Sequence, residues 1–167
     1  KLIETLINSD YKIIVRPHPE TVKRDPKLLD YIYSRFGESN LFKMEKSVFS
    51  DDSIIKADVL ICDCSGIALE YAFGTERPVV FIDVPIKINN PDYNELDIQP
   101  LELSTRTKIG VIVQPDEIEN IPNIISSIKL KSEKYKYGLS HLRESNVFSF
   151  GKSAEIGADY ILNTFDV

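Results

Sequence analysis

Residues 59–66 read Val-Leu-Ile-Cys-Asp-Cys-Ser-Gly, and this short stretch decides the fold class. Its first four residues are apolar on both faces, which is typical of a central strand in a parallel sheet. A helix is expected to open at Ser65-Gly66 and to end at Gly74, because apolar residues recur there at helical spacing. Residues 79–82 form a second continuous apolar run, so a second central strand is expected directly after that helix.

The same alternation of strands and helices extends in both directions from this unit. Further strands are expected at residues 11–15, 41–44 and 109–113, and helices at 2–7, 25–37, 50–57, 115–128, 135–143 and 154–165. Pro122 indicates that one of these helices starts late or is kinked. Residues 84–108 lack periodicity and predict a long loop. Strands that alternate with helices predict an α/β fold in which helices flank one Rossmann-like parallel sheet.

Length and composition limit the classes of protein that need to be considered. The 167 residues are 43% hydrophobic, so one core and one domain covering residues 1–167 are expected. The net charge of −6 argues against a nucleic-acid partner. No GxGxxG motif supports a nicotinamide site, and two cysteines are too few for a disulfide framework or a four-ligand zinc site. Because Lys1 falls within a helical pattern, we expect the chain to be a fragment of a longer protein.

The first candidate site segment is Arg16-Pro17-His18-Pro19-Glu20, which follows the strand expected at residues 11–15. Arg16 offers a forked donor that suits a phosphate, and His18 is of the type that titrates near neutral pH. The two prolines favour a stiff, extended loop. The alternative is an ordinary surface loop in which the histidine caps a neighbouring group. Ligands of open α/β sheets bind beyond the carboxyl ends of the strands, which makes both residues site candidates.

The second candidate segment runs from Asp63 to Glu70, where a strand leads through small residues into a helix. The first N–H groups of such a helix attract an anion. Ser65 can cap the helix or bind a phosphate oxygen, and Gly66 lets the backbone approach closely. Glu70, about one turn inside the helix, is placed to reach a ribose hydroxyl. The alternative is a serine that is only a helix cap and a glutamate that is only solvated.

The third candidate segment is Phe150-Gly151-Lys152-Ser153-Ala154, where a glycine, a lysine and a serine precede the last helix. Lys152, Ser153 and Ala154 form a helix start of the kind that favours phosphate, although the upstream glycine of a P-loop is missing. The alternative is a plain helix cap. All three segments lie at expected strand ends or helix starts, so we expect them to converge on one ligand.

Other polar or reactive residues carry weaker signals. Cys62 and Cys64 are expected to be small buried apolar residues, and His141 a surface residue. Asp83 ends a strand, but the acidic pair and lysine of a phosphoacceptor site are not in matching positions. No metal site is expected. Nothing in the spacing assigns a role to three residues of the long loop, Asp92, Tyr93 and Asp97.

Several landmarks in order resemble the CDP-glycerol glycerophosphotransferase family of teichoic-acid and capsule polymer synthesis. They are Arg16-Pro17-His18-Pro19, the stretch 57–66, Glu70-Tyr71, the stretch 77–81 and the late helix start at residues 151–154. The match is to the C-terminal lobe of that family and covers nearly the whole chain. Cys64 and Glu70 depart from the usual family pattern, and Glu70 is similar to the ribose-binding glutamate of related nucleotide-sugar enzymes.

The resemblance implies a glycosyltransferase-B-type lobe that binds the nucleotide donor. It implies a catalytic role for His18, a phosphate turn at Ser65 and Gly66, and a second helix start at Ser153. The expected enzyme moves a glycerol-phosphate or similar unit from CDP-glycerol or a related donor to a polymer or lipid-linked acceptor. An N-terminal lobe of the same protein is expected to complete it, so the fragment alone is expected to be inactive.

The resemblance implies further expectations, and two alternative hypotheses compete with it. No cofactor beyond the donor is expected, and the expected location is the cytoplasm, with peripheral attachment to the cytoplasmic face of the membrane left open. One alternative is the lobe of a nucleotide-sugar glycosyltransferase or epimerase. The other is a nucleotide-binding module without catalytic activity.

Overall fold

Short parallel strands form two small sheets in the computed structural model, which describes all residues except 47–49, 87–89, 91, 93–94, 96–98 and 165–167. The strands of the described part are β1 (Ile13–Val15), β2 (Phe42–Met44), β3 (Leu60–Cys62), β4 (Val79–Ile82) and β5 (Gly110–Val113). β1 pairs with β2 in one sheet, and β3, β4 and β5 form the other in that order. The expected strands and their parallel pairing are therefore confirmed, but the single expected sheet is divided into two.

The expectation that β3 is a central strand is wrong in this structure. Its hydrogen-bonded neighbour among the described residues is β4, and β4 is the central strand of the three. The apolar character of β3 has another cause. Val59, directly before β3, and Ile61, within β3, belong to the same apolar cluster as Ile13 of β1. The side chains of the two sheets therefore pack together although no ladder of hydrogen bonds connects the sheets. Burial on both faces, rather than pairing on both edges, explains the sequence of β3.

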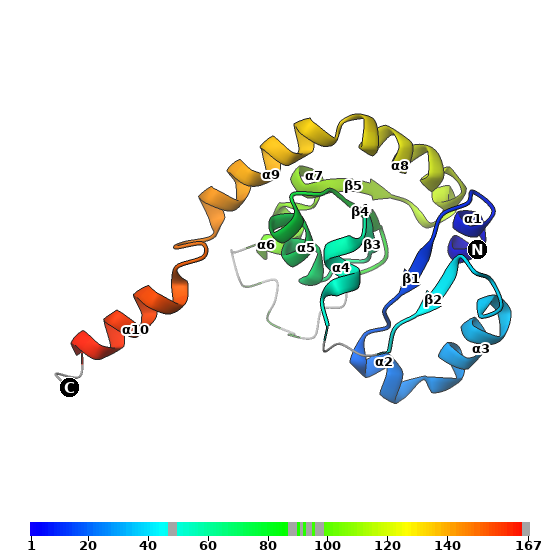
Figure 1. Cartoon of the computed structure of the whole chain (residues 1–167), viewed down its shortest axis with the longest axis horizontal. Helices are drawn as coiled ribbons and strands as arrows, with labels where there is room; N and C mark the ends of the chain where they lie inside the picture. The colour runs from blue at the N-terminus through cyan, green and yellow to red at the C-terminus, as the bar shows by residue number, and fades with distance from the viewer. Residues whose placement is uncertain (47–49, 87–89, 91, 93–94, 96–98, 165–167) are drawn as a thin grey trace.

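Helices make up most of the remaining described chain (Figure 1). They are α1 (Leu2–Ile7), α2 (Pro19–Arg24), α3 (Pro26–Phe36), α4 (Asp52–Lys56), α5 (Ile67–Thr75), α6 (Leu101–Ser104), α7 (Arg106–Ile109), α8 (Ile121–Leu130), α9 (Ser132–Asn146) and α10 (Ser153–Thr164), with a 3₁₀ helix, η2, at Pro115–Asn120. Pro122 is in the first turn of α8, which confirms the late helix start. The expected end at Gly74 is wrong, because α5 continues to Thr75 and Glu76 takes the left-handed conformation.

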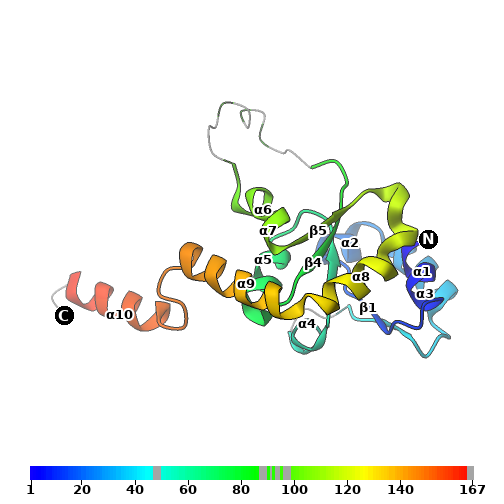
Figure 2. The ribbon, with the colours of Figure 1, turned by 90° about the horizontal axis from the view of Figure 1, so that it is seen from above.

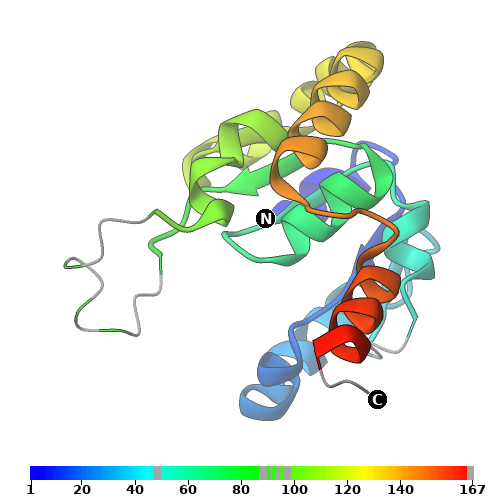
Figure 3. The ribbon, with the colours of Figure 1, turned by 90° about the vertical axis from the view of Figure 1, so that its left-hand side faces the viewer.

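The three-stranded sheet buries both faces, and alternate residues of β4 show this. Val79 and Phe81 face one cluster, which α5, α7 and α9 cover, while Val80 faces a second cluster covered by α1 and α8. Alternation of this kind follows from the two-residue period of a strand. α8 and α9 follow one another along one side of the molecule (Figure 3). Helices therefore cover both faces of this sheet.

α10 lies apart from the layers that the other helices form. Figures 1 and 2 show it projecting from the end of α9, and none of its described residues is buried. Its apolar side chains, Ile156, Tyr160, Ile161 and Leu162, are half or more exposed. In the part of the chain that the structure describes, no helix is both long and apolar enough to cross a membrane.

Candidate functional site

The turn between β3 and α5 opens onto free space. Gly66 is the residue that caps α5, and no side chain of the described residues donates or accepts a cap hydrogen bond there, so the alternative in which Ser65 is only a helix cap is not met. The Ser65 carbonyl instead accepts the N–H of Ala68 at 3.0 Å in the first turn. A Cβ added to Gly66 would meet no atom within 4 Å. A ligand can therefore approach the backbone closely at this point.

The first N–H groups of this turn are available to such a ligand. Among the hydrogen bonds between described residues, none uses the N–H of Ser65, Gly66 or Ile67. The start of a helix presents such donors in one direction and adds the positive end of the helix dipole. Glu70 is exposed one turn further on, with its own N–H bonded to the Gly66 carbonyl. The turn has the form of an anion site.

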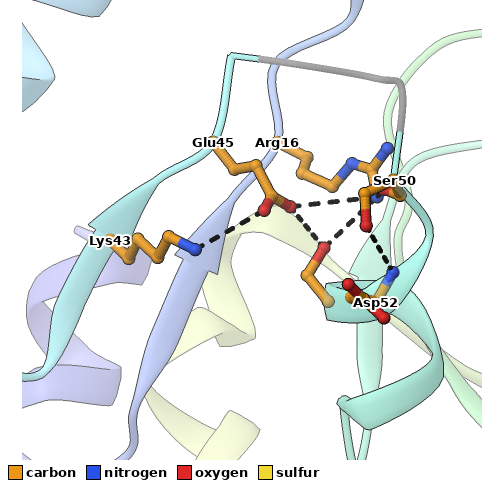
Figure 4. Close-up of polar contacts among 6 residues, drawn as sticks. Arg16, Lys43, Glu45, Ser50 and Asp52 are labelled. Carbon is orange, nitrogen blue, oxygen red and sulfur yellow. Dashed lines mark hydrogen bonds and ion pairs between the residues drawn. The ribbon is translucent and has the colours of Figure 1, made fainter.

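Arg16, at the end of β1, is occupied by groups of this chain (Figure 4). Its Nη1 donates to the Ser50 carbonyl at 2.9 Å and to Ser53 Oγ at 3.2 Å, and lies 3.9 Å from a carboxylate oxygen of Glu45. Ser53 also donates to Glu45, whose other oxygen is 3.5 Å from Lys43 Nζ. The guanidinium thereby connects the ends of β1 and β2 to the start of α4. This arrangement gives Arg16 a structural role.

His18 is the cap of α2, as the alternative interpretation of its loop proposed. Its Nδ1 accepts the N–H of Glu20 at 3.1 Å, and Pro19 supplies the first residue of the helix. The imidazole is exposed. With Nδ1 acting as an acceptor, the neutral ring carries its proton on Nε2, so Nε2 is a hydrogen-bond donor directed away from the cap. His18 therefore combines a structural cap with an outward donor.

The third candidate segment does not converge with the second. Arg143 of α9 donates to the Phe73 carbonyl at 2.7 Å and to Glu76 at 2.9 Å, which places it at the C-terminal end of α5. The Phe150 ring lies over the same guanidinium, 4.4 Å from its carbon. Residues 148–152 therefore lie near the end of α5 opposite the Ser65-Gly66 turn, about 13 Å away along a nine-residue helix.

The polar groups of the third segment form hydrogen bonds within the turn that precedes α10. Ser153 Oγ donates to the Ser149 carbonyl at 3.0 Å, and the N–H of Lys152 bonds to that same carbonyl at 2.8 Å. Ala154 follows as an exposed residue at the start of α10. These contacts match the alternative of a plain helix start. No hydrogen bond between described residues joins this segment, or His18, to the turn before α5.

The sequence interpretation missed Arg106, a buried arginine beside that turn. Its Nη1 donates to Asp83 Oδ1 at 3.0 Å, and Gln114 Nε2 donates to the other oxygen of Asp83, also at 3.0 Å. These bonds, from Gln114 and from Arg106, lower the pKa of Asp83. The guanidinium carbon lies 5.1 Å from the centre of the Phe81 ring. Arg106 is the first residue of α7 but belongs to the stretch 84–108, which was expected to be a loop, so nothing in the sequence indicated its position.

The two cysteines are free and partly buried, which agrees with the expectation that they act as small apolar residues. Burial raises the pKa of Cys62 to about 12 and also raises the pKa of Cys64, while the charge of Arg106 acts in the opposite direction on both. Burial thus disfavours the reactive thiolate form of both residues. No group of three metal-ligating side chains occurs among the described residues. His141 is exposed as expected, and Tyr93 and Asp97 lie outside the described residues.

The chemistry that this arrangement can perform is defined by its donors. Free N–H groups, the Nε2 proton of His18 and a buried guanidinium all stabilise negative charge on oxygen. No protein-family model, curated protein or solved structure matches the chain.

Proposed function

We propose that the chain is the donor-binding lobe of a transferase that moves a glycerol-phosphate or similar polyol-phosphate unit from a CDP-linked donor to a cell-surface polymer. The proposal rests on the resemblance of its motifs to CDP-glycerol glycerophosphotransferases. One structural observation carries it: after the half-buried parallel strand β3, no hydrogen bond between described residues uses the N–H groups of Ser65, Gly66 and Ile67, and the space beside Gly66 is open. This is the place where open α/β sheets bind phosphates. The proposal also includes the fold type, a Rossmann-like lobe of the glycosyltransferase-B type.

In the proposed reaction an acceptor hydroxyl attacks the β-phosphorus of the donor in line. A new oxygen–phosphorus bond forms, the bond to the bridging oxygen breaks and CMP leaves, while the hydroxyl proton passes to the solvent or to a base of the second lobe. Charge accumulates on the phosphate oxygens during this step, so fixed donors accelerate it. In the proposal the turn before α5 supplies such donors, and Glu70 is assigned to the ribose.

His18 is assigned the role of a donor to a phosphate oxygen. A base must offer a lone pair, and the Nδ1 lone pair is used by the Glu20 N–H. Nε2 carries the proton of the neutral ring, so it can donate to an oxygen but cannot accept a proton from the acceptor. The cap on α2 thus favours donation over the general-base alternative.

The proposal includes partners that the chain does not itself supply. An N-terminal lobe of the same protein would bring the polymer or lipid-linked acceptor, and no cofactor is required for the step as written. The proposed location is the cytoplasm, at the inner membrane face where polymer acceptors are anchored. Lys152, Ser153 and Ala154 would contact the donor only after a change in the position of α10.

The substitution Gly66→Ala tests the phosphate turn. Nothing in the structure opposes the added methyl group, and Gly66 has a φ of −56°, so the variant is expected to fold as the parent does. The methyl group would occupy the open space beside the turn, where a bound phosphate is proposed to approach the backbone. Calorimetric titration with CDP-glycerol is expected to show at least about tenfold weaker binding. Gly138→Ala, in an open helical position of α9, is the matched control and should bind as the parent does.

Equal CDP-glycerol affinities in the Gly66→Ala variant and the parent would overturn the assignment of the turn. His18 is tested separately, in the complete protein, by comparing His18→Asn with His18→Ala. Asparagine preserves the helix cap but removes the Nε2 donor, so both variants should lose transfer by about 10²–10³-fold. Transfer by His18→Asn at the parental rate would show that His18 is only a cap.

A further inference from the structure

Arg106 is a buried cation with unused hydrogen-bonding capacity. Its side chain is 9% exposed, and Nε has no hydrogen-bond partner among the described residues although it is shielded from solvent. Nη1 bonds to Asp83, and no hydrogen bond between described residues uses Nη2. Buried polar atoms of this kind are rare, because an unmet donor costs about 1–3 kcal/mol. An unmet donor in a buried arginine points to a missing acceptor.

The position of Arg106 relates it to the turn before α5. Its guanidinium lies over Phe81, and Phe81 is the partner of Cys62 in the β3–β4 ladder. The charge of Arg106 acts on both Cys62 and Cys64, the latter being the residue directly before Ser65. Arg106 therefore lies at the carboxyl ends of the strands, on the same side as the free N–H groups of the turn.

The surrounding charges make Arg106 the dominant cation at this place. Among the described groups that act on Cys64, Asp63 and Glu102 are negative and Arg106 is the only positive one. Asp83 holds the guanidinium with a charged hydrogen bond, and Gln114 in turn fixes Asp83. The carboxylate both orients the arginine and competes with any external anion for it.

We propose that Arg106 is a phosphate ligand of the turn at Ser65–Ile67, and that Asp83 is a positioning residue that restrains it. The anion is one phosphate of a diphosphate, bound between the helix start and the guanidinium. The inference deepens the proposed function and rests on it for the identity of the donor, but the anion site itself is defined by the residues named here. It adds a ligand that no sequence motif indicated.

The test is calorimetric titration of the whole 167-residue chain with inorganic pyrophosphate. Arg106→Met removes the cation and keeps the apolar stem, and it should weaken pyrophosphate binding roughly 10- to 100-fold. Asp83→Asn removes the competing charge and should strengthen binding severalfold. A purely structural ion pair predicts a different result, because losing either partner would then weaken binding or leave it unchanged.

Arg143→Met is the matched control for these variants. Arg143 also lies over a phenylalanine ring and pairs with a carboxylate, but it does so at the opposite end of α5. Its loss should lower the thermal unfolding temperature without changing the affinity for pyrophosphate. If Arg106→Met does not fold, the direction of the Asp83→Asn change still decides the question. An affinity that is unchanged or lower in Asp83→Asn would overturn the inference.

The same variants are titrated with CDP-glycerol to separate this inference from the proposed function. If CDP-glycerol binds the parent and all variants equally, the role of Arg106 is refuted while the proposed donor stands. If pyrophosphate shows the expected pattern but CDP-glycerol binds no more tightly than pyrophosphate, the anion site stands and the proposed donor is refuted. Absence of binding by both compounds would refute both.

Discussion

Replacing Gly110 by alanine should disrupt the ladder between β4 and β5. Gly110 is paired with Val79 at the start of the β4–β5 ladder. An alanine Cβ would overlap the Val79 carbonyl oxygen and lie 2.8 Å from its carbon, where ordinary contacts begin at 3.4 Å. The obstructing atoms are backbone, so no side-chain rotation relieves the contact, and the strands must separate.

The expected cost follows from the contacts that would be lost. Two ladder hydrogen bonds contribute about 1 kcal/mol each, and overpacking adds about 1–3 kcal/mol. We therefore expect Gly110→Ala to lower the free energy of unfolding by about 3 kcal/mol or more, measured by urea denaturation with circular dichroism. The control Gly138→Ala should raise it by about 0.5–1 kcal/mol, because alanine is the better helix residue and space is open there. A Gly110→Ala variant within about 1 kcal/mol of the parent would refute this account of β4–β5 packing.

Three further predictions concern buried and titrating side chains. Tyr71→Phe should cost about 1 kcal/mol in urea denaturation, because the lost hydroxyl donates to the Ala57 carbonyl at 2.9 Å; an unchanged midpoint would count against that bond. The hydrogen bond from Ser53 lowers the pKa of Glu45 in the folded chain. The ionised Glu45 side chain therefore stabilises the fold above the ordinary pKa of 4.5, and this stabilisation is lost as the pH falls through the lower pKa of the folded state. Glu45→Gln should therefore reduce the loss of stability between pH 6 and pH 3, and an identical pH profile would contradict this. With a pKa of about 12, only about one part in 10⁴ of the Cys62 side chain is thiolate at pH 8. Iodoacetamide should therefore label Cys62 far more slowly in the native chain than in urea, with the labelling rate measured by mass spectrometry. Comparable rates would disprove the effect of burial on the pKa of Cys62.

Local patterns predicted the five strands and most of the longer helices, because each depends on residues close in sequence. The apolar run at β4 and the Asp25-Pro26 start of α3 are examples, and the Asp25 carboxylate does accept the N–H of Leu28 at 3.1 Å. Local patterns missed the short helices α2, α6 and α7, which lie in segments that were expected to be loops. The pairing of strands is not a local property. β1 and β3 are both apolar, yet nothing in either indicates that the two belong to separate ladders.

The candidate site was predictable only where it is built from one segment. Ser65 and Gly66 follow their strand directly, so the turn was found from sequence. Arg106 reaches the same edge from a segment without periodicity, and its partner Asp83 is 23 residues away, so only the folded arrangement connects them. Ser153 was expected to lie near this turn because it precedes a helix. A helix start has the same local sequence pattern wherever the tertiary structure places it, so the pattern could not show that Ser153 lies elsewhere.

The most direct measurement of the central proposal is the dissociation constant of the chain for CDP-glycerol, compared with CDP-ribitol and a UDP-sugar by calorimetry under one set of conditions. The account predicts that a CDP-linked polyol binds more tightly than the UDP-sugar, and that Gly66→Ala weakens that binding. Tighter binding of the UDP-sugar, or no binding of any of the three, would contradict it.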